Sequence, residues 1–110
     1  MPFIDPEQLE VKEPRPGWTG RFFHGERMTF SYYDMEPGAW VHLHHHPHEE
    51  VWNVIEGELD VELDGETRTV TAGQAVVVPA DVEHRVTAKG PTRVIVVDSP
   101  ARDAVGGVQI

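Results

Sequence analysis

Short runs in which apolar and polar residues alternate dominate the chain from residue 21 onward. Within residues 59–63 apolar and acidic side chains alternate strictly, Asp64-Gly65 supplies the positive-φ pair of a tight hairpin turn, and residues 67–71 are rich in β-branched side chains. Further strand-like runs lie at 28–35, 40–43, 50–56, 75–79, 84–88 and 92–98. No long window combines a helical period with an N-terminal cap. The pattern predicts an all-β domain, a small barrel or sandwich of about eight strands.

Proline and glycine mark the expected domain boundaries. Residues 1–20 contain four prolines and two glycines, which exclude a continuous helix and predict an extended N-terminal arm. The barrel is expected over residues 21–98. Residues 99–110 form a C-terminal tail with weak strand character after Gly106-Gly107, expected to fray or to extend a sheet edge.

Composition removes several classes of function. The chain has 110 residues with 9 basic and 19 acidic side chains, a formal net charge of −10, so binding to nucleic acid or to an anionic membrane surface is not expected. The absence of cysteine excludes a disulfide framework, a thiolate metal site and a cysteine nucleophile. The opening residues do not resemble a secretory signal and the longest apolar runs are far below the ~20 residues of a membrane span, so we expect a cytoplasmic protein.

Histidine is the unusual feature of the sequence. Six of the seven histidines lie within 42–48 or at 84. Residues two apart in a strand point to the same side, so His42, His44 and His46 can all face inward, with Glu50 turning back toward them and His84 arriving from a separate hairpin. Imidazole and carboxylate together suit a divalent metal. The alternative is a solvated histidine-rich loop, and by parity His45 and His48 are expected to be exposed bystanders.

Two gapped motifs give the chain a family resemblance. Residues 38–57, GAWVHLHHHPHEEVWNVIEG, resemble the first cupin motif, Gly-x5-His-x-His-x3-Glu-x6-Gly, with every fixed position filled. Residues 73–88 resemble the second motif at Gly73, Pro79 and His84, but depart from it at Asp81, where glycine is usual, and at Ala88, where asparagine is usual. Asp is among the residues that best tolerate the left-handed backbone such a turn requires.

The resemblance to small single-domain cupins implies a fold and a metal. The implied fold is a double-stranded β-helix, the jelly-roll β-barrel. The implied cofactor is one divalent transition metal (Fe, Mn, Ni, Co or Zn) inside the barrel, held by the residues that match the family's ligands, which are His44, His46, Glu50 and His84.

Three functions of different classes follow from such a site. The first is a small metalloenzyme that acts on a carbonyl- or hydroxyl-bearing small molecule by isomerase, lyase or dioxygenase chemistry. Some small cupins with a similar histidine-rich stretch act on unsaturated uronates. The second is a non-catalytic module that binds or senses a metabolite through the metal, and the third is a structural barrel with a vestigial site.

Strand alternation also suggests wall and catalytic residues. Met28, Phe30 and Tyr32 share one face, and we expect this face to point inward. Tyr32 is then a candidate proton donor, and Trp52, Phe30 and Met28 are candidates for substrate contact. For Met28 and Phe30 the alternative is simple core packing.

The run at 50–56 is apolar on both faces, which suits a central strand covered partly by another subunit. Small cupins usually dimerise through such a sheet, so we expect a homodimer.

Overall fold

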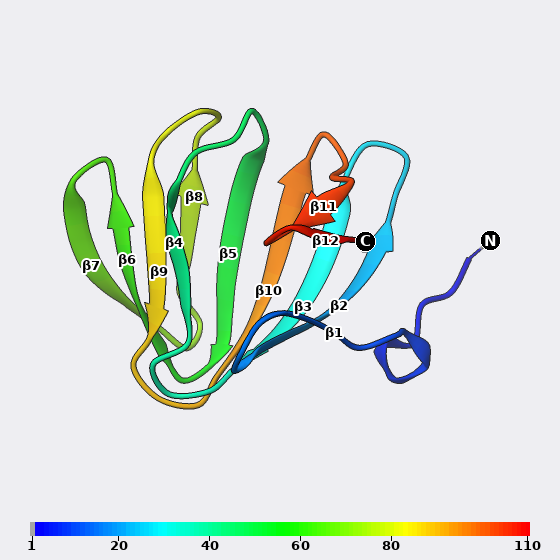
Figure 1. The fold of residues 1–110 in the computed structure, drawn as a ribbon, viewed down its shortest axis with the longest axis horizontal. Helices are drawn as coiled ribbons and strands as arrows, with labels where there is room; N and C mark the ends of the chain where they lie inside the picture. Colours follow the sequence, from blue (N-terminus) through cyan, green and yellow to red (C-terminus); the bar gives the residue numbers. More distant parts are fainter. Residues whose placement is uncertain (1) are drawn as a thin grey trace.

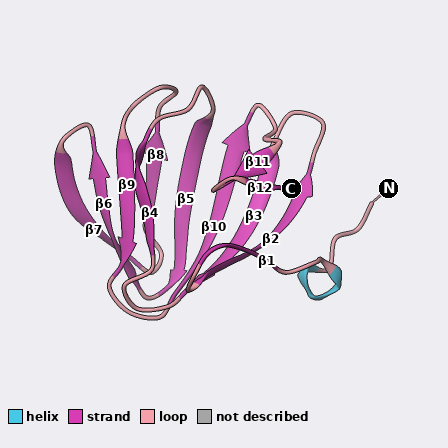
Figure 2. Cartoon of the chain, viewed as in Figure 1, coloured by secondary structure: helices cyan, strands magenta, loops and turns pink. Residues whose placement is uncertain are grey.

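The structure is a computed structural model that describes residues 2–110, so the first residue of the predicted arm lies outside the described range. Within these residues nearly all regular structure is β-strand, preceded by one short 3-10 turn (Figure 2). In chain order the elements are η1 (Pro6–Gln8), β1 (Lys12–Arg15), β2 (Trp18–His24), β3 (Thr29–Met35), β4 (Trp40–His44), β5 (Glu49–Glu56), β6 (Glu58–Leu63), β7 (Glu66–Thr71), β8 (Ala75–Val78), β9 (His84–Ala88), β10 (Thr92–Ser99), β11 (Ala104–Val105) and β12 (Val108–Gln109).

Two antiparallel sheets face each other and enclose the core (Figure 1). The larger sheet has the order β1-β2-β3-β10-β5-β8, and the smaller has the order β4-β9-β6-β7. The hairpin β11–β12 overlaps β10 and β3 in this view (Figure 1), and its turn at Gly106 lies close to Trp18 of β2. After β3 the chain crosses from one sheet to the other at every connection except the β6–β7 hairpin, which is the crossing pattern of a jelly roll. The predicted all-β jelly-roll fold is confirmed.

The interior is filled by β-branched and aromatic side chains from both sheets. Val54 and Val94 of the larger sheet and Leu59 and Val86 of the smaller are at most 1% exposed. Each lies at an inward position of an alternating strand, so a side chain from one sheet packs against the other. This packing fixes the distance between β4 and β5, the two strands on either side of the histidine-rich loop.

The inward face of β3 differs from the expected one. Thr29, Ser31 and Tyr33 are buried, whereas Met28, Phe30 and Tyr32 are not, so the prediction that the latter three point inward is wrong. Both faces of this strand carry aromatic rings, and alternation alone cannot choose between them. The pairing of β3 with β2 determines which face points inward. In the interior the Tyr33 ring packs edge-on against Trp18 of β2, and on the outside Phe30 stacks on Phe23.

Both chain ends contribute to the barrel more than expected. The boundary expected after residue 20 falls inside β2, which begins at the buried Trp18. The C-terminal tail forms a hairpin whose Val105 is 3% exposed, and Lys12 Nζ donates a hydrogen bond of 2.8 Å to the carbonyl of Gln109. The N-terminal strand and the C-terminal hairpin therefore lie together beside one end of the barrel.

Two aspartates occupy turns with a left-handed backbone. Asp64 has φ 49° in the β6–β7 hairpin, where it precedes Gly65 at φ 82°, as the Asp-Gly pair predicts. Asp81 has φ 64° in the loop before β9. The substitution of Asp for the glycine usual in the second motif therefore preserves the turn that brings His84 into place. Along residues 2–110 no helix is both long and apolar enough to cross a membrane.

Gly57, which joins β5 to β6, leaves no space for a side chain. Its φ is +85°, and a Cβ atom built there would lie 2.3 Å from the carbonyl oxygen of Pro91 and 2.9 Å from Cα of Thr92. Neither neighbour can yield easily, because both contacts are with backbone atoms.

We expect Gly57→Ala to lower the free energy of unfolding by roughly 2–4 kcal/mol, from the left-handed backbone and the overlap together. Urea denaturation followed by tryptophan fluorescence measures this change. Gly90→Ala is the control, because a Cβ atom at Gly90 meets no described atom within 4 Å. Equal midpoints for the two variants would contradict the assignment of Gly57 as a strained position.

Candidate metal centre

The candidate ligands come from two loops at the same end of the barrel. β4 ends at His44 and β5 begins at Glu49, so His46 lies in the loop that crosses from the smaller sheet to the larger (Figure 1). His84 opens β9, the strand beside β4, and is the register partner of His44. An irregularity in register between Val41 and His44 shifts the end of β4, so His44 turns toward the interior while His42 remains exposed.

Backbone carbonyls orient the three imidazoles. Nδ1 of His44 donates to the carbonyl of His42 at 2.6 Å, Nδ1 of His46 to that of His48 at 3.0 Å, and Nδ1 of His84 to that of Val82 at 3.0 Å. A carbonyl can only accept, so each Nδ1 carries the hydrogen and each Nε2 is free to present a lone pair. Metal-binding histidines in proteins are oriented by the same kind of bond.

The three rings converge. The ring centroid of His84 lies 4.3 Å from that of His44 and 4.9 Å from that of His46. One nitrogen from each of the three rings lies within 4.8 Å of the others. The Nε2 atoms of His46 and His84 are buried and find no hydrogen-bond partner within residues 2–110. Two orphaned acceptors in a buried position are costly unless a cation or proton satisfies them.

Glu50 lies on the larger sheet opposite these rings. Its Oε2 is 3.4 Å from Nε2 of His46, and its Oε1 is 3.5 Å from Nε2 of His84. Burial alone would raise the pKa of Glu50, but its contacts with the two histidines and the bond from Trp52 Nε1 hold that pKa well below its ordinary value. The carboxylate is therefore charged and faces imidazole lone pairs, an arrangement that a cation between them would stabilise.

Two further residues pack behind Glu50. Asp98 is the register partner of Glu50 on β10, and Arg102 Nη1 lies 3.3 Å from Glu50 Oε2 and 3.8 Å from Asp98 Oδ1. Burial, together with the neighbouring Glu50 carboxylate, raises the pKa of Asp98 to about 9. Asp98 is therefore protonated near neutral pH, and Glu50 remains the single charged carboxylate of this group.

Burial also sets the charge of the rings. It lowers the pKa of His44 to about 4, so this imidazole is neutral near pH 7 and its Nε2 is available to a metal. For His84 burial acts in the same direction, but the nearby Glu50 carboxylate and the bond to the Val82 carbonyl together outweigh it and raise the pKa above the ordinary value. A proton on His84 and a metal ion would thus compete for the same lone pair.

These residues fit a divalent transition metal. Three imidazole nitrogens and one carboxylate form a mixed nitrogen and oxygen ligand set, with tautomers already fixed and lone pairs converging. An octahedral ion held by four protein ligands retains two positions for other molecules. His44, His46, Glu50 and His84 are the four residues predicted from the motif spacing, and the structure brings all four together.

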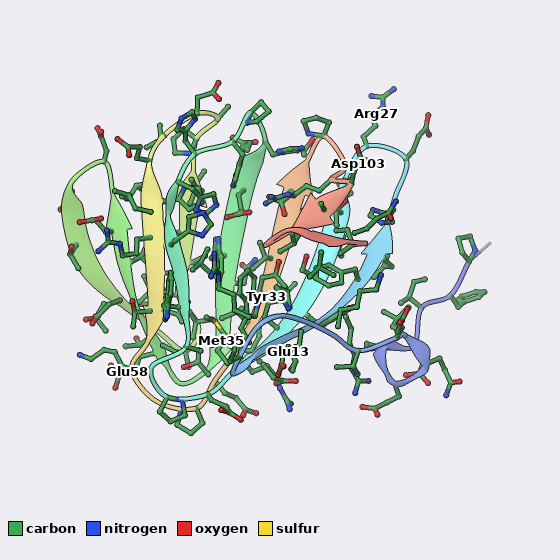
Figure 3. All side chains as sticks on the ribbon, viewed as in Figure 1. Glu13, Arg27, Tyr33, Met35, Glu58 and Asp103 are labelled. Atoms are coloured by element: carbon green, nitrogen blue, oxygen red, sulfur yellow. The ribbon has the colours of Figure 1, made fainter. Side chains whose placement is uncertain are left out.

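A pocket of about 350 Å³ opens onto this group of residues. Its aromatic and aliphatic walls are Trp18, Tyr33, Val41, Trp52 and Val105. Tyr33 is buried inside the barrel, close to Met35 of the same strand (Figure 3). Burial raises the pKa of Tyr33, so its hydroxyl stays protonated.

The other predicted site residues lie elsewhere. Trp52 is in the pocket wall, as expected. Met28 is exposed in the β2–β3 loop, Phe30 and Tyr32 lie on the outer face of the larger sheet, and Tyr33 takes the inward place that was assigned to Tyr32. His45 is exposed, with 62% of its side-chain surface accessible. The His42 ring contacts Arg15 and lies 4.8 Å from the His44 ring, but it is not among the rings whose nitrogens converge.

Besides Tyr33, sequence reasoning missed further residues that line the pocket or support it. Asp98 follows Thr92, Val94 and Val96 at the inward positions of its strand, so a carboxylate at that parity is a signal that could have been used. Trp18, Arg15 and Arg102 have no such signal, because they come from segments taken to be an arm and a tail.

A family profile decides the classification. The Cupin domain profile matches residues 31–98, which include both motifs and all four candidate ligands. The chain belongs to the cupin family.

Known proteins resemble this cupin over different lengths. An RmlC-like cupin from Shewanella frigidimarina is 29% identical with a TM-score of 0.87, covering 92% of each chain. KdgF from a Halomonas species is 28% identical with a TM-score of 0.88, covering 94% of this chain and 96% of that one. Polyketide synthase CurC from Streptomyces cyaneus is 46% identical over 52 residues, which is 46% of this chain and 34% of that protein. The match therefore spans about a third of that curated relative.

Replacement of His46 by alanine should lower metal affinity by more than the roughly 10- to 100-fold that changes around a ligand cost, because a ligand itself is lost. Metal-free protein titrated with Zn²⁺ or Mn²⁺ by calorimetry, with elemental analysis of the purified protein, measures the effect. His45→Ala is the matched control, since this exposed neighbour faces away from the site. If both variants lose metal equally, the assignment by spacing is wrong.

Proposed function

We propose that this cupin is a small metalloenzyme that acts on a carbonyl- or hydroxyl-bearing small molecule. The observation that carries the proposal is the convergence of three imidazoles, oriented by Nδ1–H bonds, opposite Glu50 and beside an open pocket, with the Nε2 atoms of His46 and His84 unsatisfied. His44, His46, Glu50 and His84 would hold one divalent ion. When bound, such an ion polarises carbonyl or hydroxyl oxygens and lowers the pKa of bound water.

The residues around the pocket have two further roles, which are to orient Glu50 and to form an apolar wall. Trp52 and Arg102 hold the Glu50 carboxylate from two sides, which fixes the orientation of its oxygens. Trp18 and Tyr33, packed edge-on with centroids 5.2 Å apart, form a rigid apolar wall against which a carbon skeleton can lie. Close packing of this wall excludes water from one side of a bound molecule.

Among reaction types, the pocket favours proton transfer at a carbonyl, as in an isomerase or lyase. The candidate metal ligands beside the pocket and the Tyr33 hydroxyl, which stays protonated, are placed to stabilise negative charge that develops on a carbonyl oxygen in such a reaction. A volume of about 350 Å³ suits a molecule of one ring or a short chain. The partial likeness to a polyketide synthase supports the inclusion of β-dicarbonyl compounds among test substrates.

The alternative is a module that binds a metabolite through the metal without turnover. The same ligands and pocket would serve it, and the short match to a longer relative supports it, because a domain of this kind can act within a larger assembly.

A turnover screen distinguishes these functions. Protein with its metal identified by elemental analysis is incubated with unsaturated uronates, hydroxy acids and β-dicarbonyl compounds under air and under argon. We expect turnover in both gases, and its loss in His46→Gln with little loss in His45→Gln. Oxygen uptake that depends on substrate would instead indicate a dioxygenase. Tight binding with no turnover of any compound would favour the binding module.

We also propose that the outer face of the larger sheet pairs with a second copy of the chain. A row of apolar side chains crosses five adjacent strands through paired positions: Val77, Val51, Val97, Phe30 and Phe23. The outer face of the smaller sheet is polar, with Glu62 opposite Arg85 and Asp60 opposite Thr87. An apolar face is complementary to itself, which is what a two-fold dimer requires, whereas the charged face is not.

We expect light scattering to give the mass of a dimer at micromolar concentration. Phe30→Lys should shift the protein to a monomer, because it would bury two unpaired charges at the interface. Thr69→Lys introduces the same charge at an exposed position of the smaller sheet and should leave the dimer intact. A monomeric wild-type protein would contradict the proposal.

A further inference from the structure

Two arginines lie in the wall of the pocket beside the candidate ligands. Arg15 comes from β1 and Arg102 from the segment between β10 and β11. The chain as a whole carries a net charge of −10, yet Glu50 is the one acidic residue among the described residues that line this pocket. The pocket is therefore locally positive in an acidic protein, and this favours an anionic ligand.

Arg15 is held in place without an acidic partner. Its Cζ lies 4.7 Å from the centroid of the Trp40 ring, and its Nη2 lies 3.1 Å from Nδ1 of His42. Arg15 is also the register partner of Trp18, so its backbone is anchored by the β1–β2 pairing. No carboxylate of residues 2–110 lies within ion-pair distance of Arg15. A fixed guanidinium with no counter-charge is prepared to bind an anion from outside the chain.

Unsatisfied hydrogen-bond donors support the same conclusion. Nε of Arg15 and Nε of Arg102 are both buried, and neither has a hydrogen-bond partner within the described part of the chain. Arg102 also uses its Nη1 on Glu50, so its remaining capacity is small, whereas most of the Arg15 fork is free. A buried N–H of a charged group that lacks an acceptor costs free energy, which an oxyanion in the pocket would recover.

We propose that Arg15 determines specificity by binding a carboxylate of the substrate, with Arg102 adding positive charge across the pocket. This inference rests on the proposed function, because it concerns the ligand of the same pocket. A carboxylate is favoured because its two coplanar oxygens match one guanidinium fork. The substrate class is then a small carbonyl- or hydroxyl-bearing carboxylic acid whose anionic end lies toward β1 and whose other oxygens lie toward the histidines.

A matched pair of chelators tests this without the need for turnover. Kojic acid and comenic acid share one hydroxypyranone ring, with a hydroxymethyl group in the first and a carboxylate in the second. Calorimetric titration of Zn²⁺-loaded protein should show that comenic acid binds roughly 10- to 100-fold more tightly. Arg15→Gln should remove this preference and leave the affinity for kojic acid unchanged, and Arg15→Lys should retain part of it. The Nε–H resonance of Arg15 in NMR spectra should shift with comenic acid and not with kojic acid.

Arg68→Gln is the control, because it removes the same charge from an exposed position of β7 and should preserve the preference. Equal affinities for the two chelators in the wild type, or a preference that survives both Arg15 variants, would overturn the inference while the metal site stands. Inorganic phosphate that binds more tightly than comenic acid through Arg15 would overturn the assignment of a carboxylate. Failure of the wild-type protein to take up Zn²⁺ would instead overturn the proposed function, and the inference with it.

Discussion

The hydrogen bonds from three histidine Nδ1 atoms to backbone carbonyls are the constraint on which the rest of the site depends. Each bond leaves an Nε2 lone pair exposed to the interior, and together they bring three acceptors opposite a charged carboxylate. The carbonyls of His42 and His48 belong to the same short segment as the rings they orient, and that of Val82 lies two residues from His84. The orientation is thus local, and it needs only the correct backbone path through two loops.

The barrel supplies that path. β4 and β9 are neighbours in one sheet, which puts His44 beside His84, while β5 lies in the other sheet and brings Glu50 across the interior. Asp81 at φ 64° and the register shift in β4 are local departures from regular structure, and each turns one ligand inward. Behind Glu50, the protonated Asp98 and the cation of Arg102 keep one negative charge at this point of the barrel instead of two.

The sequence predicts the strands and the proximity of the four candidate ligands because both depend on short-range spacing. The Asp64-Gly65 turn, the histidines two residues apart and the two gapped motifs are all visible along the chain, and the structure brings the four residues together. The face of β3 could not be predicted in this way. Tyr32 and Tyr33 have the same side chain, so the alternation of apolar and polar residues cannot show which of them points inward. The packing of Tyr33 against Trp18 decides this, and that packing is a contact between two strands. Asp98 could have been found from its parity, whereas Arg15 and Arg102 depend on where the chain ends fold.

The residues that the sequence predicts lie in the central part of the chain, and those that it misses lie mostly in the flanking segments. The four candidate metal ligands lie within the family match at 31–98, where two sheets must pack and spacing is constrained. Arg15 and Trp18 precede this region, and Arg102 and Val105 follow it, yet all four line the pocket. Contacts between the ends, such as that of Lys12 with the carbonyl of Gln109, hold these segments together beside the pocket. Changes in the flanking segments can therefore alter the ligand that the pocket accepts, and through the contact of Arg102 with Glu50 they also reach one candidate metal ligand.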